Sequence, residues 1–296
     1  MKLKNLYVSY ISSLKPEFCE KVISLGLSKM KDNKNKGIST SAIVRSDKQI
    51  NNDKQDKNEN LKSLTSSDKT IEEIKKDNNE LEKLYFRNSE VCWLNNKWIF
   101  ESLIPIMADA NKKAGWNWQI DSAEQSQFTV YHGTEDNSGF YGWHSDGFSD
   151  QAGAYKPALK ISENPLRFKQ PKRNKENKII LDNKGNPEVD MGTEDIPLNK
   201  DRSGLNPSFS EDIKKWGKVR KISMTVNLTD PKNYKGGNLK FDLGPHIKQD
   251  RFKVCDDIRP QGSAVVFPSF TYHCVTPVTS GTRYSLVIWF LGKPWQ

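Results

Sequence analysis

The chain has 296 residues, which suits one large domain or two small ones, and its 8 Trp, 13 Phe and 9 Tyr can fill a core although only 35% of the residues are hydrophobic. The net charge of +9 favours acidic partners, including nucleic acid and small anionic cosubstrates, but lysine is frequent along the whole chain. No run of 18 apolar residues is present, which excludes a transmembrane helix, and the start is too polar after Ile11 for a signal peptide. The four cysteines are scattered without a C-x-x-C pair, so we expect no disulfide scaffold and a soluble cytoplasmic protein.

Residues 1–120 predict a helical N-terminal support for the rest of a single domain, 1–296. A helix opens at Pro16 and carries its apolar residues near one face up to Leu27. The polar residues of about 31–69 predict a flexible insertion, in which only 41–46 resembles a strand.

Two further helical patterns follow this insertion. Ile71, Ile74, Leu81 and Tyr85 recur near helical spacing. The apolar residues between Trp98 and Met107 predict a second helix, which either ends or kinks at Pro105 or continues to the Ala114-Gly115 pair.

Residues 121–290 predict a β-sandwich or barrel, because several short strands are separated by turn signals. The strand-like runs are 127–132, 222–228, 238–243, 263–268 and 284–291. A second insertion of about 150–215 contains a basic run, 167–178, and a hairpin over 178–191 that turns at 183–186. We interpret the basic run as a solvated loop rather than a nucleic-acid patch.

The strongest chemical signal is the triplet His144-Ser145-Asp146. Side chains at i and i+2 of an extended segment point to the same side, so one imidazole and one carboxylate can bind the same ion. His273 is the best candidate for a third ligand. Two histidines and one carboxylate on one face of an ion leave its other positions open, which suits Fe(II) oxygen chemistry. An H-x-D triplet also occurs by chance, and a single histidine in an apolar strand is often a core residue.

Arg283 follows His273 by ten residues and a turn, so we expect the two on adjacent antiparallel strands. A buried arginine in an apolar strand needs an anionic partner, and its planar fork suits the carboxylate of a bound diacid. Ser285 shares the face of Arg283, and Tyr131 lies upstream of His144, so each can add a hydrogen bond or simply pack. His132 and His246 are not expected to be ligands, and Trp143 can wall the site or pack.

These motifs occur in a fixed order with a glycine-containing run, as Tyr131, His144-x-Asp146, Gly236-Gly237-Asn238-Leu239-Lys240-Phe241, His273 and Arg283-x-Ser285. The order resembles the prolyl 4-hydroxylase-like branch of the 2-oxoglutarate/Fe(II) dioxygenases, and residues 227–241 are similar to the PKHD-type hydroxylases. The resemblance covers about residues 121–290, apart from the second insertion. It implies a mainly β fold with flanking helices, namely a double-stranded β-helix or jelly roll.

The resemblance also implies roles for these residues. His144, Asp146 and His273 would be the catalytic iron ligands, while Arg283, with Tyr131 and Ser285, would bind 2-oxoglutarate. The expected cofactors are Fe(II), 2-oxoglutarate and O2, with ascorbate as a further candidate. The expected reaction hydroxylates a C–H bond, with a prolyl residue of a peptide or protein as the family-based substrate, and releases succinate and CO2.

Three alternatives stay open on the sequence. A nucleic-acid dealkylase of the same superfamily would use the basic charge, but such enzymes usually carry a second arginine where this chain has Trp289. A non-catalytic metal-binding jelly roll explains the triad but not Arg283. An interaction protein that has lost its activity would keep only the fold. A carboxylate at Asp146 disfavours a halogenase, in which that position is left to halide. Nucleic acid and membranes are not expected partners, and the oligomeric state is not indicated.

Overall fold

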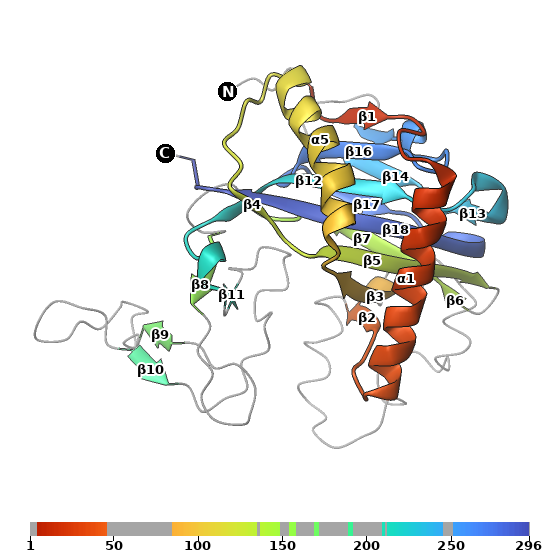
Figure 1. Ribbon diagram of the computed structural model, residues 1–296, viewed down its shortest axis with the longest axis horizontal. Helices are drawn as coiled ribbons and strands as arrows, with labels where there is room; N and C mark the ends of the chain where they lie inside the picture. The colour runs from red at the N-terminus through yellow and green to blue at the C-terminus, as the bar shows by residue number, and fades with distance from the viewer. Residues whose placement is uncertain are drawn as a thin grey trace, which may run out of the picture.

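The computed structural model describes residues 5–45, 85–134, 137–148, 154–157, 169–171, 189–191, 209–210, 212–244 and 251–295. Its main feature is one curled, largely antiparallel sheet with two helices packed on its outer face (Figure 1). The helices are α1 (Pro16–Asn35) and α5 (Lys97–Lys113). None of the helices in the described part of the chain combines the length and the apolarity that spanning a bilayer requires.

The first half of the sheet has the strand order β1-β16-β12-β18-β5-β3. Its strands are β1 (Val8–Tyr10), β16 (Ala264–Pro268), β12 (Val219–Asn227), β18 (Val278–Gly292), β5 (Ser126–Thr134) and β3 (Tyr85–Leu94). The second half continues from β3 in the order β7-β17-β14-β15. Its strands are β7 (Phe140–His144), β17 (His273–Val275), β14 (Leu239–Asp242) and β15 (Phe252–Val254).

The path of the chain through these halves is that of a jelly roll. From β5 onward, the main strands pass repeatedly from one half to the other, so that β5, β12, β16 and β18 form the first half and β7, β14, β15 and β17 the second. Such exchange between two facing sheets is how jelly rolls limit their open edges. The predicted fold class, mainly β with flanking helices, is therefore confirmed.

Smaller elements complete the described part of the chain. Short strands flank the sheet or lie in the second insertion: β2 (Ser41–Arg45), β4 (Ser122–Ala123), β6 (Asn137–Ser138), β8 (Lys156–Pro157), β9 (Lys169–Pro171), β10 (Val189–Met191), β11 (Phe209–Ser210) and β13 (Tyr234–Gly236). Three single turns of 3-10 helix are η3 (Ile213–Lys215), η4 (Pro231–Asn233) and η5 (Asp256–Ile258).

The two faces of the first half have opposite character. On β18, Leu286, Ile288 and Phe290 are buried in the apolar core that also contains residues of α1 and α5. The alternating residues Arg283 and Ser285 are equally buried but are not part of that core. Because side chains alternate across a strand, this second set faces the interior of the jelly roll. The fold therefore has an apolar outer layer under the helices and an interior that is polar at Arg283 and Ser285 but apolar where Phe241 and Phe267 pack together.

Helix α1 packs against the sheet through a glycine. A Cβ at Gly26 would lie 2.3 Å from the ring of Phe128, and the Cys92 thiol donates to the Gly26 carbonyl. The close approach requires that no side chain stands between helix and strand. The prediction that α1 starts at Pro16 is confirmed, although the helix continues to Asn35, into the stretch expected as an insertion.

Helix α5 confirms the second helical prediction. It runs through Pro105, which is exposed, so the carbonyl group that Pro105 leaves unpaired can bind water. Its C-cap is Ala114 and Gly115 follows with φ +69°, as expected for the end of a helix. The strands expected at 127–132, 222–228, 238–243, 263–268 and 284–291 are present as β5, β12, β14, β16 and β18.

Two expectations need correction and two fall largely outside the described residues. Tyr85 begins strand β3 rather than ending a helix, whereas residues 71–84 of that pattern lie outside the described part. The turn expected at 183–186 also lies outside it, but β10 pairs with β9 in an antiparallel manner.

The prediction that His273 and Arg283 lie on adjacent strands is wrong. Strand β17 pairs with β7 and β14, while β18 pairs with β5 and β12. The chain crosses between the halves around Pro277, which has no N–H for a strand ladder. The division into a support, 1–120, and a core, 121–290, stays a prediction.

Candidate metal centre

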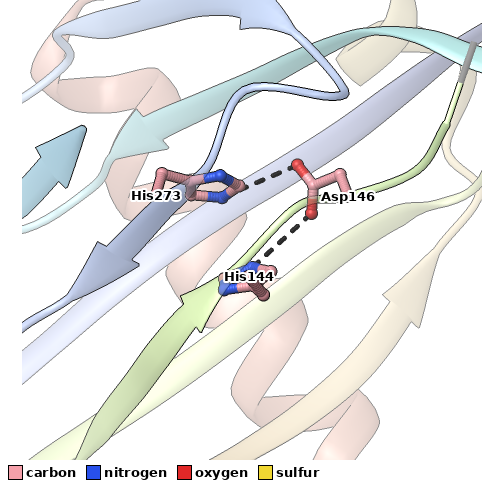
Figure 2. A group of neighbouring side chains, drawn as sticks. All are labelled: His144, Asp146 and His273. Carbon is pink, nitrogen blue, oxygen red and sulfur yellow. Dashed lines mark ion pairs between the residues drawn. The ribbon is translucent and has the colours of Figure 1, made fainter. Parts of the chain in front are cut away.

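Three of the predicted ligands meet at one point in the interior of the jelly roll. His144 ends β7, Asp146 follows two residues later, and His273 begins β17 directly opposite His144 in the strand register. The Nε2 atoms of His144 and His273 each lie 3.7 Å from one carboxylate oxygen of Asp146, so both rings are directed at the same group (Figure 2). One donor atom from each residue lies within 4.8 Å of the others.

Both imidazoles are held in the tautomer that metal binding requires. His144 Nδ1 lies 2.7 Å from the Gly142 carbonyl oxygen, and His273 Nδ1 lies 2.9 Å from the Thr271 carbonyl oxygen. A carbonyl oxygen can only accept a hydrogen bond, so each Nδ1 must carry the proton. In the neutral ring, Nε2 then keeps its lone pair and is available to a metal ion.

The electrostatics of the group favour a cation. Burial and the neighbouring His273 lower the pKa of His144 to about 3, so this ring is neutral at physiological pH. Burial raises the pKa of Asp146. The opposing effects of His273, His144, a Ser223 hydrogen bond and Arg220 are larger together, so the net shift of this pKa is downward. The Oδ2 atom of Asp146 is buried and has no hydrogen-bond partner among the described residues. A carboxylate with an unsatisfied buried oxygen beside two imidazoles is a donor set that fits Fe(II).

A bulge in β7 places Tyr141 on the same face as His144. In the register with β17, His273 lies opposite His144 and Val275 lies opposite Tyr141, so β7 has one extra residue in this interval. The Tyr141 ring stacks on the His144 ring with centroids 3.6 Å apart and an angle of 15°. The guanidinium of Arg87, which lies opposite Tyr141 on β3, covers the Tyr141 ring at 4.4 Å. The His144 ring is therefore held by packing as well as by its hydrogen bond.

A second arginine holds the backbone at Asp146. Arg220 Nη1 donates to the Asp146 carbonyl oxygen at 3.1 Å, while Nε and Nη2 donate to the two oxygens of Glu124 at 2.6 and 2.9 Å. Glu124 also accepts a 2.6 Å hydrogen bond from the hydroxyl of Tyr155, a residue of the second insertion. Burial raises the pKa of Glu124, but the charge of Arg220 more than compensates and lowers it. Asp146 is thus linked to the insertion through a charged pair.

The residues predicted to bind a diacid are also inside the jelly roll. Arg283 on β18 lies opposite Tyr131 on β5, and Ser285 lies opposite Thr129. The Arg283 side chain is only 2% exposed, its guanidinium lies 5.5 Å from the Tyr131 ring centre, and its Nη1 has no hydrogen-bond partner among the described residues. A buried arginine without a partner is costly, so this arrangement fits an anionic ligand. The roles of Arg283, Tyr131 and Ser285 remain predictions.

The remaining sequence candidates lie elsewhere. His132 is half exposed and contacts Glu90 at 3.1 Å, away from the triad, and His246 lies outside the described residues. Trp143 packs against Phe252 and Tyr272. Sequence reasoning missed four residues that support the centre, namely Arg87, Tyr141, Glu124 and Arg220. None of them lies in a motif with metal-ligand spacing, so the structure was needed to find them.

Comparison with known families agrees with this site. Residues 208–291 match the model of the 2OG-Fe(II) oxygenase superfamily. This segment includes β12, β14, β16, β17 and β18, and therefore both His273 and Arg283. The match agrees with the family that the motif order predicted, over the part of the chain that contains His273, Arg283 and Ser285.

The curated relatives point to the predicted branch. The chain is 41% identical over 70 residues to a PKHD-type hydroxylase from Synechococcus sp. (strain CC9605) and 41% identical over 68 residues to the PKHD-type hydroxylase YbiX from Escherichia coli O157:H7. These alignments cover 24% and 23% of this chain but only 29% and 27% of the relatives. The chain thus matches less than a third of the length of either relative.

Solved structures of similar arrangement include two prolyl hydroxylases. A Pseudomonas putida prolyl-4-hydroxylase has a TM-score of 0.45 and 12% identity, covering 97% of this chain and 93% of its own. The viral collagen prolyl hydroxylase from Paramecium Bursaria Chlorella virus-1, in complex with 2OG, has a TM-score of 0.46 and 12% identity, covering 98% and 97%.

Proposed function

We propose that this protein is an Fe(II)- and 2-oxoglutarate-dependent dioxygenase that hydroxylates a C–H bond of its substrate. The observation that carries the proposal is the pairing of the His144, Asp146 and His273 triad with Arg283, a buried arginine that lacks an anionic partner among the described residues. A structural metal site would account for the triad but would give no reason to bury Arg283.

The three ligands would hold Fe(II) and leave its remaining positions for the cosubstrates. Bound iron would supply the activation of O2 that side chains cannot provide. Arg283 would bind the carboxylate of 2-oxoglutarate remote from the metal, with Tyr131 and Ser285 as further donors. The balanced reaction converts substrate, 2-oxoglutarate and O2 into hydroxylated substrate, succinate and CO2.

The chain's own residues would position the reacting groups. Gly142 and Thr271 carbonyl oxygens fix the two imidazoles, Tyr141 packs on His144, and Arg220 holds the backbone of Asp146. Such support keeps ligands in place without rearrangement during the reaction.

The proposed substrate is a prolyl residue of a peptide or protein. Its support is the PKHD-type hydroxylases among the relatives. We further propose that ascorbate supports turnover. The four buried, free cysteines fit a reducing intracellular compartment.

The test is formation of succinate from 2-oxoglutarate by the purified protein with Fe(II) and O2, followed by nuclear magnetic resonance. His144→Ala should abolish turnover and weaken Mn(II) binding measured by calorimetry, with an unchanged circular dichroism spectrum. His132→Ala is the matched control, because its side chain contacts Glu90 rather than the triad. Undiminished turnover in His144→Ala would refute the proposed iron site. Mass spectrometry of proline-containing peptides should then show a product heavier by one oxygen atom, and ascorbate should prolong its formation.

A further inference from the structure

A second interior arginine, Arg87, has no role in the proposed cosubstrate site. It lies on β3 opposite Tyr141 and is 9% exposed. Its Nε donates to the Ser89 hydroxyl at 2.8 Å and its Nη2 donates to the Gln127 side-chain carbonyl at 2.9 Å. Both acceptors are neutral, and no carboxylate pairs with Arg87 in the part of the chain that the structure describes.

The guanidinium has donors left for a ligand. Arginine has five N–H groups, of which these two hydrogen bonds use one on Nε and one on Nη2. The N–H groups that remain lie on Nη1 and Nη2, which form the edge that binds a carboxylate with two parallel hydrogen bonds. Ser89 and Gln127 hold the opposite side of the fork and the Tyr141 ring covers its flat face, so the orientation of the guanidinium is fixed before a ligand binds.

The charges of the interior leave Arg87 uncompensated. Bound Fe(II) and Arg283 would carry as much positive charge as Asp146 and a bound, doubly ionised 2-oxoglutarate would carry negative charge. Arg220 is already paired with Glu124. A buried positive charge without a counter-ion is unfavourable, and a ligand with one negative charge would balance it.

Arg87 and Arg283 also contact different parts of β5. Arg87 is hydrogen-bonded to Gln127, whereas Arg283 lies opposite Tyr131. Arg87 covers the Tyr141 ring that stacks on His144, whereas Arg283 faces the Tyr131 ring, so Arg87 can bind a molecule other than the diacid at Arg283.

We propose that Arg87 binds a carboxylate group of the substrate, so that the substrate is an acid at physiological pH. This inference rests on the proposed function. The carboxylate can belong to a free amino acid or to the C-terminus of a peptide, and Arg87 would recognise both through the same pair of hydrogen bonds. It would thereby orient the substrate relative to the iron ligands as a specificity-determining residue.

The test measures binding rather than turnover, on the full chain loaded with Zn(II) and 2-oxoglutarate. The probes are the twenty amino acids and a set of proline-containing tripeptides, each as the free acid and as the primary amide. A rise in the thermal unfolding midpoint of the protein identifies the probes that bind, and calorimetry then gives their dissociation constants. We expect at least one acid to bind and its amide to bind at least tenfold more weakly. Whether that acid is an amino acid or a tripeptide then identifies the source of the carboxylate.

Variants then assign the effect to Arg87. Arg87→Met should weaken binding of the selected acid by about 30-fold or more, because a desolvated carboxylate loses its partner. Arg87→Lys keeps the charge without the fork and should recover part of the affinity. The matched control is Arg251→Met, which removes a partly exposed arginine paired with Asp242 and should leave the affinity unchanged.

Affinity for 2-oxoglutarate is measured first and separates this inference from the proposed function. If the wild-type protein does not bind 2-oxoglutarate, the proposed function fails. If it does, the inference is overturned by any of three results, namely equal binding of acids and amides, unchanged acid binding in both Arg87 variants, or no acid bound in either set. Loss of 2-oxoglutarate binding in a folded Arg87→Met protein would also overturn it, because Arg87 would then belong to the cosubstrate site.

Discussion

Replacing Arg283 with methionine should have opposite effects on stability and on ligand binding. Methionine keeps an unbranched stem, which matters because the Arg283 Cδ packs 2.9 Å from the position a Cβ would take on Gly237. The substitution removes a guanidinium that is 2% exposed and whose Nη1 has no partner among the described residues. A buried unsatisfied donor costs about 1–3 kcal/mol, so the ligand-free variant should be more stable by roughly that amount.

The same change should weaken 2-oxoglutarate binding strongly. Removing one partner of a buried charged pair costs about 2–5 kcal/mol, which corresponds to a dissociation constant about 30- to 4,000-fold higher. Urea unfolding of the ligand-free protein measures the first effect, and calorimetry with Mn(II) and 2-oxoglutarate measures the second. The proposal that Arg283 binds an anionic ligand would be contradicted by either of two results. One is a free energy of unfolding of Arg283→Met that is lower than that of the wild type by more than about 1 kcal/mol, and the other is unchanged binding of 2-oxoglutarate.

Three other predictions test the surroundings of the site. Folding lowers the pKa of Glu124, so its pair with Arg220 stabilises the protein at pH values above the unfolded pKa of about 4.3, and this contribution is lost as the pH falls through the lower pKa of the folded state. Glu124→Gln should therefore lower the free energy of unfolding by about 3–5 kcal/mol at pH 7. Urea titrations below pH 4 should show a progressively smaller difference between the variant and the wild type. Gly237→Ala should lower the free energy of unfolding by about 1–3 kcal/mol, because φ is +63° and the new Cβ would lie 2.9 Å from Arg283, and an unchanged urea midpoint would contradict this packing. Burial raises the pKa of Cys92 to about 11, so this thiol should react with Ellman's reagent at pH 8 only after unfolding. Rapid labelling of Cys92 in the native protein would contradict the close packing of α1 on the sheet.

The sequence predicted the residues whose chemistry depends on local spacing. His144 and Asp146 are two residues apart, and the apolar residues of β5, β12, β16 and β18 follow recognisable strand patterns. It did not predict β3, because the inward face of this strand is polar at Arg87 and Ser89 and gives no clean alternation. A strand that lines a binding site is difficult to recognise by hydrophobic pattern.

Contacts between distant segments could not be predicted from the sequence either. Glu124 and Arg220 are 96 residues apart, and their pairing depends on β18, which pairs both with β12 and with β4, the strand just before Glu124. The placement of His273 and Arg283 in different halves depends on the crossing at Pro277, which in sequence resembles an ordinary hairpin turn. Spacing along the chain specifies neither the partner of a strand nor the sheet to which it belongs.

The two ends of the second insertion are joined where they leave the jelly roll. The Tyr155 N–H donates to the Lys218 carbonyl at 2.8 Å, and the Gly217 N–H donates to the Tyr155 carbonyl at 2.9 Å. Doubling the length of a loop whose ends already meet costs only about 0.6 kcal/mol. The segment between these joined ends can therefore be lengthened, shortened or exchanged between homologues while Tyr155 keeps its contact with Glu124. Protein engineers could graft new loops at this position and leave the metal ligands untouched.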